Sequence, residues 1–193
     1  HAFYYSVRGP RIDERPPDVG PNSAWWDQYR PFADSVQRLC WLNTDSRHIC
    51  ELAILGLNDH LPWRAAKICF QNQRDFNYIE ARHLWEDARV DRNGIRIAGM
   101  HYRALIVEVE PPEKAKPALD VLEKSGRLIR WNERMEDSEL PGRIDQLVPV
   151  DVNVRPTKHD LRVRHVFKNG ADYYIVFNEG QDNLEVELET SLK

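Results

Sequence analysis

The chain has 193 residues, of which 41% are hydrophobic and 30% charged, the composition of a soluble globular protein. Its net charge of −4 provides no basic field, so we expect neither nucleic acid nor an anionic membrane as a partner. No apolar run approaches the roughly 20 residues of a membrane-spanning helix, and the residues after His1 lack the pattern of a signal peptide.

The N-terminal part predicts a loop followed by a helix. Residues 1–7 are aromatic and strand-like, and residues 8–21 are rich in proline and glycine, which predicts a stiff loop. Residues 22–43 predict a helix, because apolar side chains recur every three or four positions and form one stripe. The stripe comprises Trp25, Tyr29, Phe32, Val36, Leu39 and Cys40. Pro31 either kinks this helix or opens its second segment.

Apolar runs and helical patterns then alternate. Residues 49–57 are nearly all apolar, which predicts a strand buried on both faces, and residues 104–109 predict a second one. Pro62 is expected at the first position of the helix between them. Further strands are expected at 77–80 and 128–131, further helices at 81–88, 113–124 and 141–147, and a hairpin at Asn93-Gly94. This order predicts an α/β fold with an open, mainly parallel sheet and helices packed on it.

From about residue 156 the apolar period changes to two. Residues 161–167 and 184–189 alternate, and residues 173–177 run back after the turn Lys168-Asn169-Gly170. The pattern predicts a short antiparallel β meander at the C-terminus. Two or three strands do not bury a core alone, so this piece either begins a β-sandwich or packs on the α/β part.

The three cysteines, Cys40, Cys50 and Cys69, form no CxxC pair and lie in apolar contexts. We interpret them as small core side chains, with metal or redox roles as the alternative. Unpaired cysteines favour a reducing compartment, and we expect a cytoplasmic protein.

An open α/β sheet often binds ligands beyond the carboxyl ends of its strands. Those positions hold Asn58-Asp59-His60 and Glu110-Pro111-Pro112, and neither stretch is glycine-rich. Without a phosphate-binding glycine motif, HxH or HxxxH, we expect no cofactor and no metal. No cysteine stands on a strand-to-helix turn, which argues against the thiol chemistry of glutamine amidotransferases.

Two clusters of polar residues are candidates for function. His83 with Glu80, Glu86 and Asp87 could perform acid/base chemistry, although a solvated helix face explains the same residues. His1, Tyr5, Glu14 and Trp26 combine aromatic faces with polar groups, as a sugar site does. The alternative, in which the aromatics are core residues and the charges lie on the surface, stays open.

Three N-terminal segments resemble a known class of enzymes. They are residues 1–6 (His-Ala-Phe-Tyr-Tyr-Ser), residues 14–26 from Glu14 to the Trp25-Trp26 pair, and Phe32-Ala-Asp34 followed by Arg38-Leu39. They are similar to the segment that leaves the catalytic (β/α)8 barrel of large bacterial glycoside hydrolases, of the α-L-rhamnosidase type and its β-galactosidase-related relatives.

The resemblance implies a flavodoxin-like α/β domain with helices on both faces, similar to the amidotransferase-like, or trimerisation-type, domain of some β-galactosidases. Residues 78–80, 99–106 and 119–129 resemble its middle strands, and residues 164–165 and 173–178 resemble the first strands of a following β-sandwich. The implied organisation is a barrel-exit segment at 1–21, the flavodoxin-like domain at 22–155 and the opening of the β-sandwich at 156–193.

The barrel that provides the two carboxylates of glycoside hydrolysis would precede His1, so the resemblance supplies no catalytic residue. It implies that the chain is a non-catalytic accessory portion, with a structural role or a role in forming a homo-oligomer. The chain would then contact carbohydrate only as part of the parent enzyme. His1, Tyr5, Glu14 and Trp26 would then border the sugar site. A stand-alone α/β module that binds a small ligand or a partner beside Asn58–His60 is the alternative.

Overall fold

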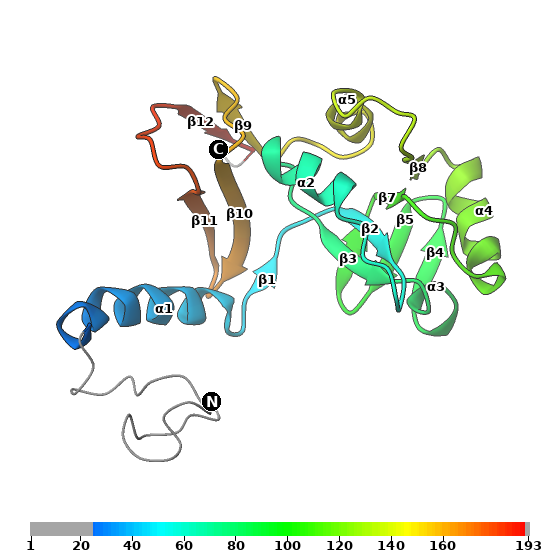
Figure 1. The fold of residues 1–193 in the computed structure, drawn as a ribbon. Coiled ribbons are helices and arrows are strands. Elements are labelled where there is room, and N and C mark those ends of the chain that lie inside the picture. The colour runs from blue at the N-terminus through cyan, green and yellow to red at the C-terminus, as the bar shows by residue number, and fades with distance from the viewer. Residues whose placement is uncertain (1–24, 192–193) are drawn as a thin grey trace, which may run out of the picture. The chain divides into compact units, whose positions relative to one another are not determined.

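The computed structural model describes residues 25–191, and the chain divides into two units between Ser46 and Arg47 (Figure 1). In the first unit a 3-10 turn, η1 (Trp26–Gln28), leads into helix α1 (Tyr29–Asn43). The strand and loop predicted for residues 1–21 and the predicted helix start at residue 22 lie outside the described residues. No described helix is long and apolar enough to cross a lipid bilayer.

Helix α1 confirms the predicted helix, but its apolar stripe is not part of a core. None of the described residues of this unit is buried, and Phe32 is 62% exposed. The described residues of this unit form one helix with its leading 3-10 turn, and a helix needs a second layer to bury its apolar face. Pro31 lies in the first turn of α1, where the missing N–H removes no intrahelical hydrogen bond.

The second unit is built on a four-stranded parallel sheet in the order β3-β2-β7-β8. The strands are β2 (Leu52–Gly56), β3 (Asn77–Glu80), β7 (Ala104–Val107) and β8 (Leu128–Arg130). Numbered one to four along the chain, they take the spatial order 2-1-3-4. The structure therefore confirms the predicted parallel sheet, although each buried strand is shorter than its apolar run.

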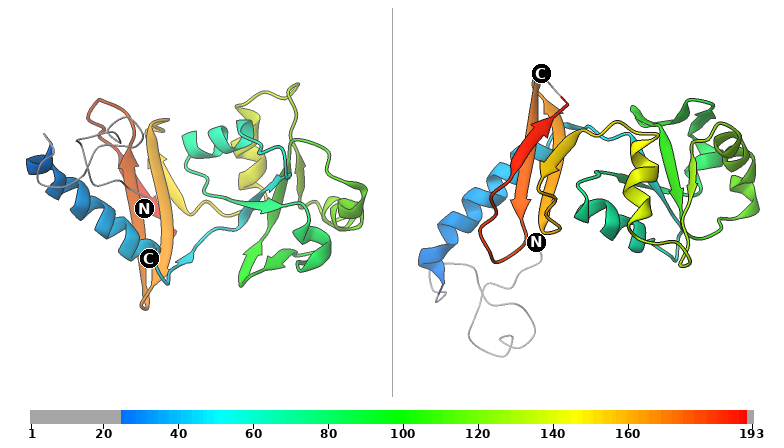
Figure 2. Two further views of the ribbon diagram at one scale, coloured as in Figure 1. Left: turned by 60° about the horizontal axis from the view of Figure 1, so that its bottom comes forward. Right: turned by 90° about the horizontal axis from the view of Figure 1, so that it is seen from above.

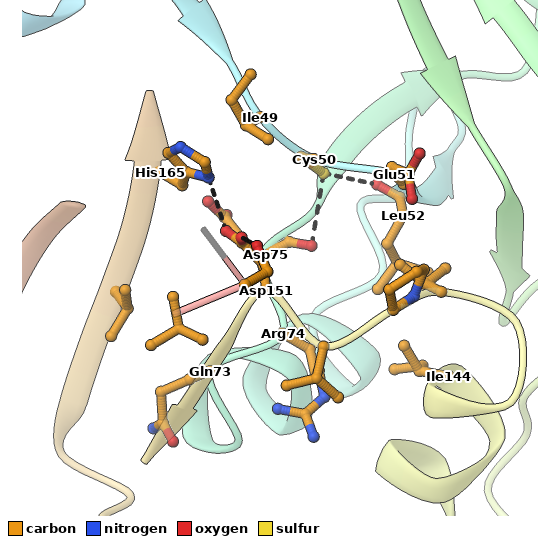
Figure 3. A pocket seen from close by; sticks show the side chains of 16 residues that line it. Ile49, Cys50, Glu51, Leu52, Gln73, Arg74, Asp75, Ile144, Asp151 and His165 are labelled. Carbon is orange, nitrogen blue, oxygen red and sulfur yellow. Dashed lines mark hydrogen bonds and ion pairs between the residues drawn. The ribbon is translucent and has the colours of Figure 1, made fainter. Parts of the chain in front are cut away.

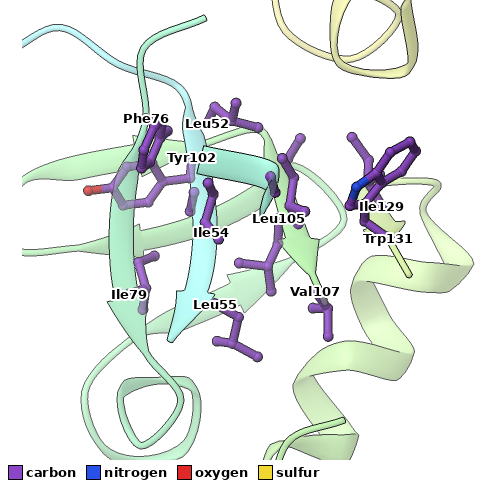
Figure 4. Packing of buried hydrophobic residues seen from close by; sticks show 14 of the residues in the cluster. Leu52, Ile54, Leu55, Phe76, Ile79, Tyr102, Leu105, Val107, Ile129 and Trp131 are labelled. Atoms are coloured by element: carbon purple, nitrogen blue, oxygen red, sulfur yellow. The ribbon is translucent and has the colours of Figure 1, made fainter. Parts of the chain in front are cut away.

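The sheet is covered on both faces by helices (Figure 2). Helices α2 (Arg64–Gln71) and α5 (Glu139–Asp145) pack together on one face, and α3 (His83–Glu86) and α4 (Lys116–Lys124) lie on the other, the last after the turn η2 (Glu113–Ala115). All five residues of β2 are buried, and Ile54 and Leu105 have no exposed surface (Figure 4). Burial of one such side chain stabilises the fold by about 1.5–3 kcal/mol.

A small antiparallel sheet connects α3 to β7. Its strands are β4 (Arg89–Asp91), β5 (Gly94–Ile97) and β6 (Met100–Tyr102). The hairpin predicted from Asn93-Gly94 is confirmed, since Asp91 pairs with Gly94. Gly94 has φ +128°, and a Cβ there would lie 2.0 Å from the carbonyl oxygen of Tyr102. This turn therefore requires glycine.

The C-terminal strands are antiparallel, as predicted. One sheet contains β1 (Arg47–His48), β10 (Leu161–Lys168) and β11 (Ala171–Asn178), and the other pairs β9 (Val152–Arg155) with β12 (Glu187–Thr190). β12 thus joins β9 instead of continuing from β11. Val152, Val154 and Leu161 form a small core of their own here. Gln73 connects this region to the α/β part, because its side-chain amide donates to the carbonyl oxygens of Lys158 and Leu161.

Candidate functional site

A hollow of about 180 Å³ lies near the amino ends of β2 and β3 (Figure 3). Cys50, Asp75, Asp151 and His165 are among the residues that line it. A thiol, an imidazole and two carboxylates in one hollow are the residue types of nucleophilic catalysis, so their contacts decide whether any of them is available.

The Cys50 thiol is a core side chain and not an activated nucleophile. Its Sγ donates to the carbonyl oxygens of Leu52 at 3.1 Å and Asp75 at 3.5 Å. Burial, followed by the charge of Asp75, raises the pKa of Cys50 to about 12, and burial also raises the pKa of Cys69. Core positions are therefore confirmed for these two cysteines. The prediction is wrong for Cys40, which is exposed on α1, where none of the described residues is buried.

His165 is buried between two carboxylates. Its Nδ1 lies 2.8 Å from Asp151 Oδ2 and its Nε2 lies 2.8 Å from Asp172 Oδ1. The Tyr174 ring stacks on the imidazole with centroids 4.1 Å apart, and Asp151 also accepts hydrogen bonds from the hydroxyl groups of Tyr174 and Ser191. Both ring nitrogens lie within hydrogen-bond distance of a carboxylate, so neither is left to act on a substrate.

His48 has a similar arrangement. Its Nε2 lies 2.5 Å from Asp75 Oδ2, and its Nδ1 lies 2.9 Å from Asn77 Oδ1. The Asn77 amide in turn donates to the Tyr102 hydroxyl. The polar groups at the amino end of the sheet thus satisfy one another and join the C-terminal strands to the α/β part.

The carboxyl ends of the strands, where the sequence predicts a ligand, have two larger hollows. The loop of residues 57–63 after β2 contributes to both. One, of about 610 Å³, is lined by Asn58, Leu61, Tyr78, Glu80 and His83, with the mainly apolar end of the β5–β6 hairpin. The other, of about 550 Å³, is lined by His60, Trp63, Arg64, Glu108, Val109, Trp131, Asn132, Glu133 and Arg134.

The acid/base set suggested around His83 is divided into surface pairs. Glu80 Oε2 accepts from Arg82 Nε at 2.9 Å, and Arg82 also lies 3.5 Å from Glu86. His83 Nδ1 pairs with Asp87 Oδ1 at 2.8 Å. The hydrogen bond from Arg82 to Glu80 raises the pKa of that guanidinium. These contacts favour the solvated helix face over a catalytic cluster.

Two glutamates at the carboxyl edge also have structural partners. Glu108 Oε1 accepts the backbone N–H of Ala65 at 2.5 Å, which caps the first turn of α2. Glu110 Oε2 accepts from Arg130 at 2.8 Å. Arg64 donates to Asp137 and to the carbonyl oxygen of Asn132, and its guanidinium lies 5.4 Å from the centroid of the Trp131 ring.

Of the residues predicted to border a sugar site, His1, Tyr5 and Glu14 lie outside the described residues. Trp26 is exposed, and its ring stacks on Tyr29 with centroids 5.4 Å apart. Trp63 and Trp131 were not identified from the sequence as candidate site residues. The available signal was an aromatic residue directly after Pro62 in the loop that follows a buried strand.

Among residues 25–191 there is no group of three or more His, Cys, Asp or Glu side chains that could hold a metal ion. Comparisons of the chain with protein-family models and with curated proteins find no match.

Proposed function

We propose that this chain is a non-catalytic accessory portion of a glycoside hydrolase, whose carboxylate pair is provided by a catalytic barrel elsewhere. Two observations support the proposal. The N-terminal segments resemble the barrel-exit segment of such enzymes. The strand order 2-1-3-4 matches the first four strands of the flavodoxin-like order 2-1-3-4-5, as the resemblance implies.

The main support is that several chemically competent side chains of the described hollows, Glu80, Glu108 and His165 among them, already have structural partners. Glu108 caps a helix, Glu80 pairs with Arg82, and both ring nitrogens of His165 lie 2.8 Å from carboxylate oxygens. The Cys50 thiol stays protonated near neutral pH because its pKa is raised to about 12. A general acid or nucleophile needs a free group beside the reacting bond, and these groups are engaged.

The proposal includes the domain scheme of residues 1–21, 22–155 and 156–193, with a β-sandwich opening at the last boundary. In this scheme the α/β part has a structural role, which includes the formation of a homo-oligomer. His1, Tyr5, Glu14 and Trp26 border the sugar site of the parent enzyme.

The test is turnover of aryl glycosides by the purified 193-residue chain. We expect hydrolysis no faster than in buffer across a panel of sugars and both anomers. Variants Glu80→Gln and Glu108→Gln are the matched controls, because they remove carboxylates from the two hollows. Hydrolysis that either substitution abolishes would refute the accessory role.

The second candidate is a stand-alone α/β module that binds a small ligand or a partner beside Asn58–His60. The two hollows on either side of this loop favour it, because their volumes of about 610 and 550 Å³ lie in the range of ligand sites. The extent of the reading frame separates the candidates. A coding sequence that starts close to His1 would support the module and contradict the accessory portion.

A further inference from the structure

The hollow beside Trp63 has the position and size of a ligand site. Its volume of about 550 Å³ lies within the usual range of roughly 300–1,000 Å³ for small-molecule sites. Its walls come from the loop after β2, the start of α2, the end of β7 and the segment after β8. These elements meet at the carboxyl edge of the sheet, where open α/β sheets bind ligands.

Trp63 offers an aromatic face to this hollow. It is 66% exposed, although its neighbours Pro62 and Ala65 are buried. Its carbonyl oxygen accepts the N–H of Lys67 at 2.8 Å, which holds its backbone at the start of α2. An exposed indole on a fixed backbone can stack on the apolar face of a ring at low cost in conformational entropy.

The polar groups around the hollow differ in their availability. Arg64 and Glu108 are held by the contacts described above. The side chains of His60, Glu133 and Arg134 are exposed, and the structure gives them no hydrogen bond to another described residue. An imidazole, a carboxylate and a guanidinium together supply both donors and acceptors to a ligand.

The charges around the hollow indicate a neutral ligand. Arg64 and Arg134 are balanced by Glu108 and Glu133, and Asp137 further neutralises Arg64. The N-terminus of α2, where a phosphate would bind, is occupied by the Glu108 carboxylate. An anionic ligand would therefore meet two carboxylates and lack the usual helix-terminal site.

Trp131 forms part of the wall through its ring. It is 1% exposed, and its Nε1–H has no hydrogen-bond acceptor among the described residues. Its ring lies under the guanidinium groups of Arg64 and Arg143, at 5.4 and 5.9 Å from the centroid. Buried donors are normally satisfied, so this indole N–H is an exception among the described residues.

We propose that this hollow is a binding site for a neutral saccharide, with Trp63 stacking on the sugar ring and with His60, Glu133 and Arg134 bonding its hydroxyl groups. The inference deepens the second candidate function, and it does not require the chain to belong to a hydrolase. Saccharide binding without hydrolysis is compatible with both candidates.

The test is a titration of the 193-residue chain with neutral mono- and disaccharides, followed by calorimetry and by ligand-observed NMR. D-galacturonate and inorganic phosphate are the anionic probes. We expect saturable binding of at least one neutral sugar and weaker binding of both anions. Binding should weaken roughly tenfold in Trp63→Ala, because truncation of an aromatic anchor typically costs at least that much. Arg134→Ala should weaken it less.

Phe177→Ala is the matched control, because it also removes an exposed aromatic side chain, 59% exposed, but from β11. It should bind the sugar as the parent chain does, and circular dichroism should show that all three variants are folded. The proposal is overturned if no neutral sugar binds saturably, if Trp63→Ala binds normally, or if an anion binds more tightly. The aryl-glycoside assay is read separately, so hydrolysis would refute the accessory role without affecting this site.

Discussion

Substitutions of Glu108 test whether its side chain caps helix α2 or acts as a catalytic acid. Its Oε1 accepts the N–H of Ala65, a first-turn donor without an intrahelical partner, at 2.5 Å. Glu108→Gln keeps an acceptor oxygen but removes the charge from the helix N-terminus, which should cost about 0.3–1 kcal/mol. Glu108→Ala also removes the acceptor. An added capping loss of about 0.5–2 kcal/mol gives a total of about 1–3 kcal/mol.

The series is measured by urea unfolding followed by far-UV circular dichroism. Amide hydrogen exchange at Ala65 reports the cap locally and should accelerate in Glu108→Ala more than in Glu108→Gln. Glu110→Gln is the control, since the exposed pair of Glu110 with Arg130 contributes about 1 kcal/mol or less. Equal stabilities of the parent chain and Glu108→Ala, with unchanged exchange at Ala65, would refute the role of the cap.

Three further predictions concern the packing of the chain. Iodoacetamide should label Cys40 in the native chain and reach Cys50 and Cys69 only after unfolding, as measured by mass spectrometry. Rapid labelling of all three cysteines in the native chain would contradict the burial of Cys50 and Cys69. Gly94→Ala should lower the free energy of unfolding by about 2–4 kcal/mol through its positive φ and the clash with the next strand, and an unchanged denaturation midpoint would argue against this turn. His165→Ala should cost about 1–3 kcal/mol, since its two carboxylate partners, each about one-third exposed, lose a buried hydrogen-bonding ring. Wild-type stability would show that the cluster is dispensable.

The regular elements were predictable from the sequence because their periodicity is local. The apolar runs give β2 and β7, and Asn93-Gly94 gives the β4–β5 turn. The start of α2 was not predictable in this way. Pro62 would suit the first helical position, but its carbonyl oxygen accepts the Tyr78 hydroxyl at 2.5 Å, and the helix begins at Arg64. A contact between residues 16 positions apart in the chain overrides the local preference.

The same limit applies to the candidate site. The sequence predicts that a ligand would bind at the edge of the sheet where the buried strands end. It does not predict that Trp63 and Trp131 line one hollow, because that depends on the order of the strands in the sheet. The apolar stripe of α1 shows the converse. Its spacing correctly predicts a helix, yet the pattern is the same whether a second layer covers it or not.

The two ends of the parallel sheet differ in what they contain. The histidine pairs that join the C-terminal strands lie near the amino ends, and the two large hollows lie at the carboxyl ends. Exposed residues of the loops at 57–63 and 131–134, such as His60, Trp63 and Arg134, can therefore vary during evolution, or in a combinatorial library, without touching the groups that fasten the strands together. Sequence changes at these exposed positions would alter the lining of the hollows and leave the strand pairing in place.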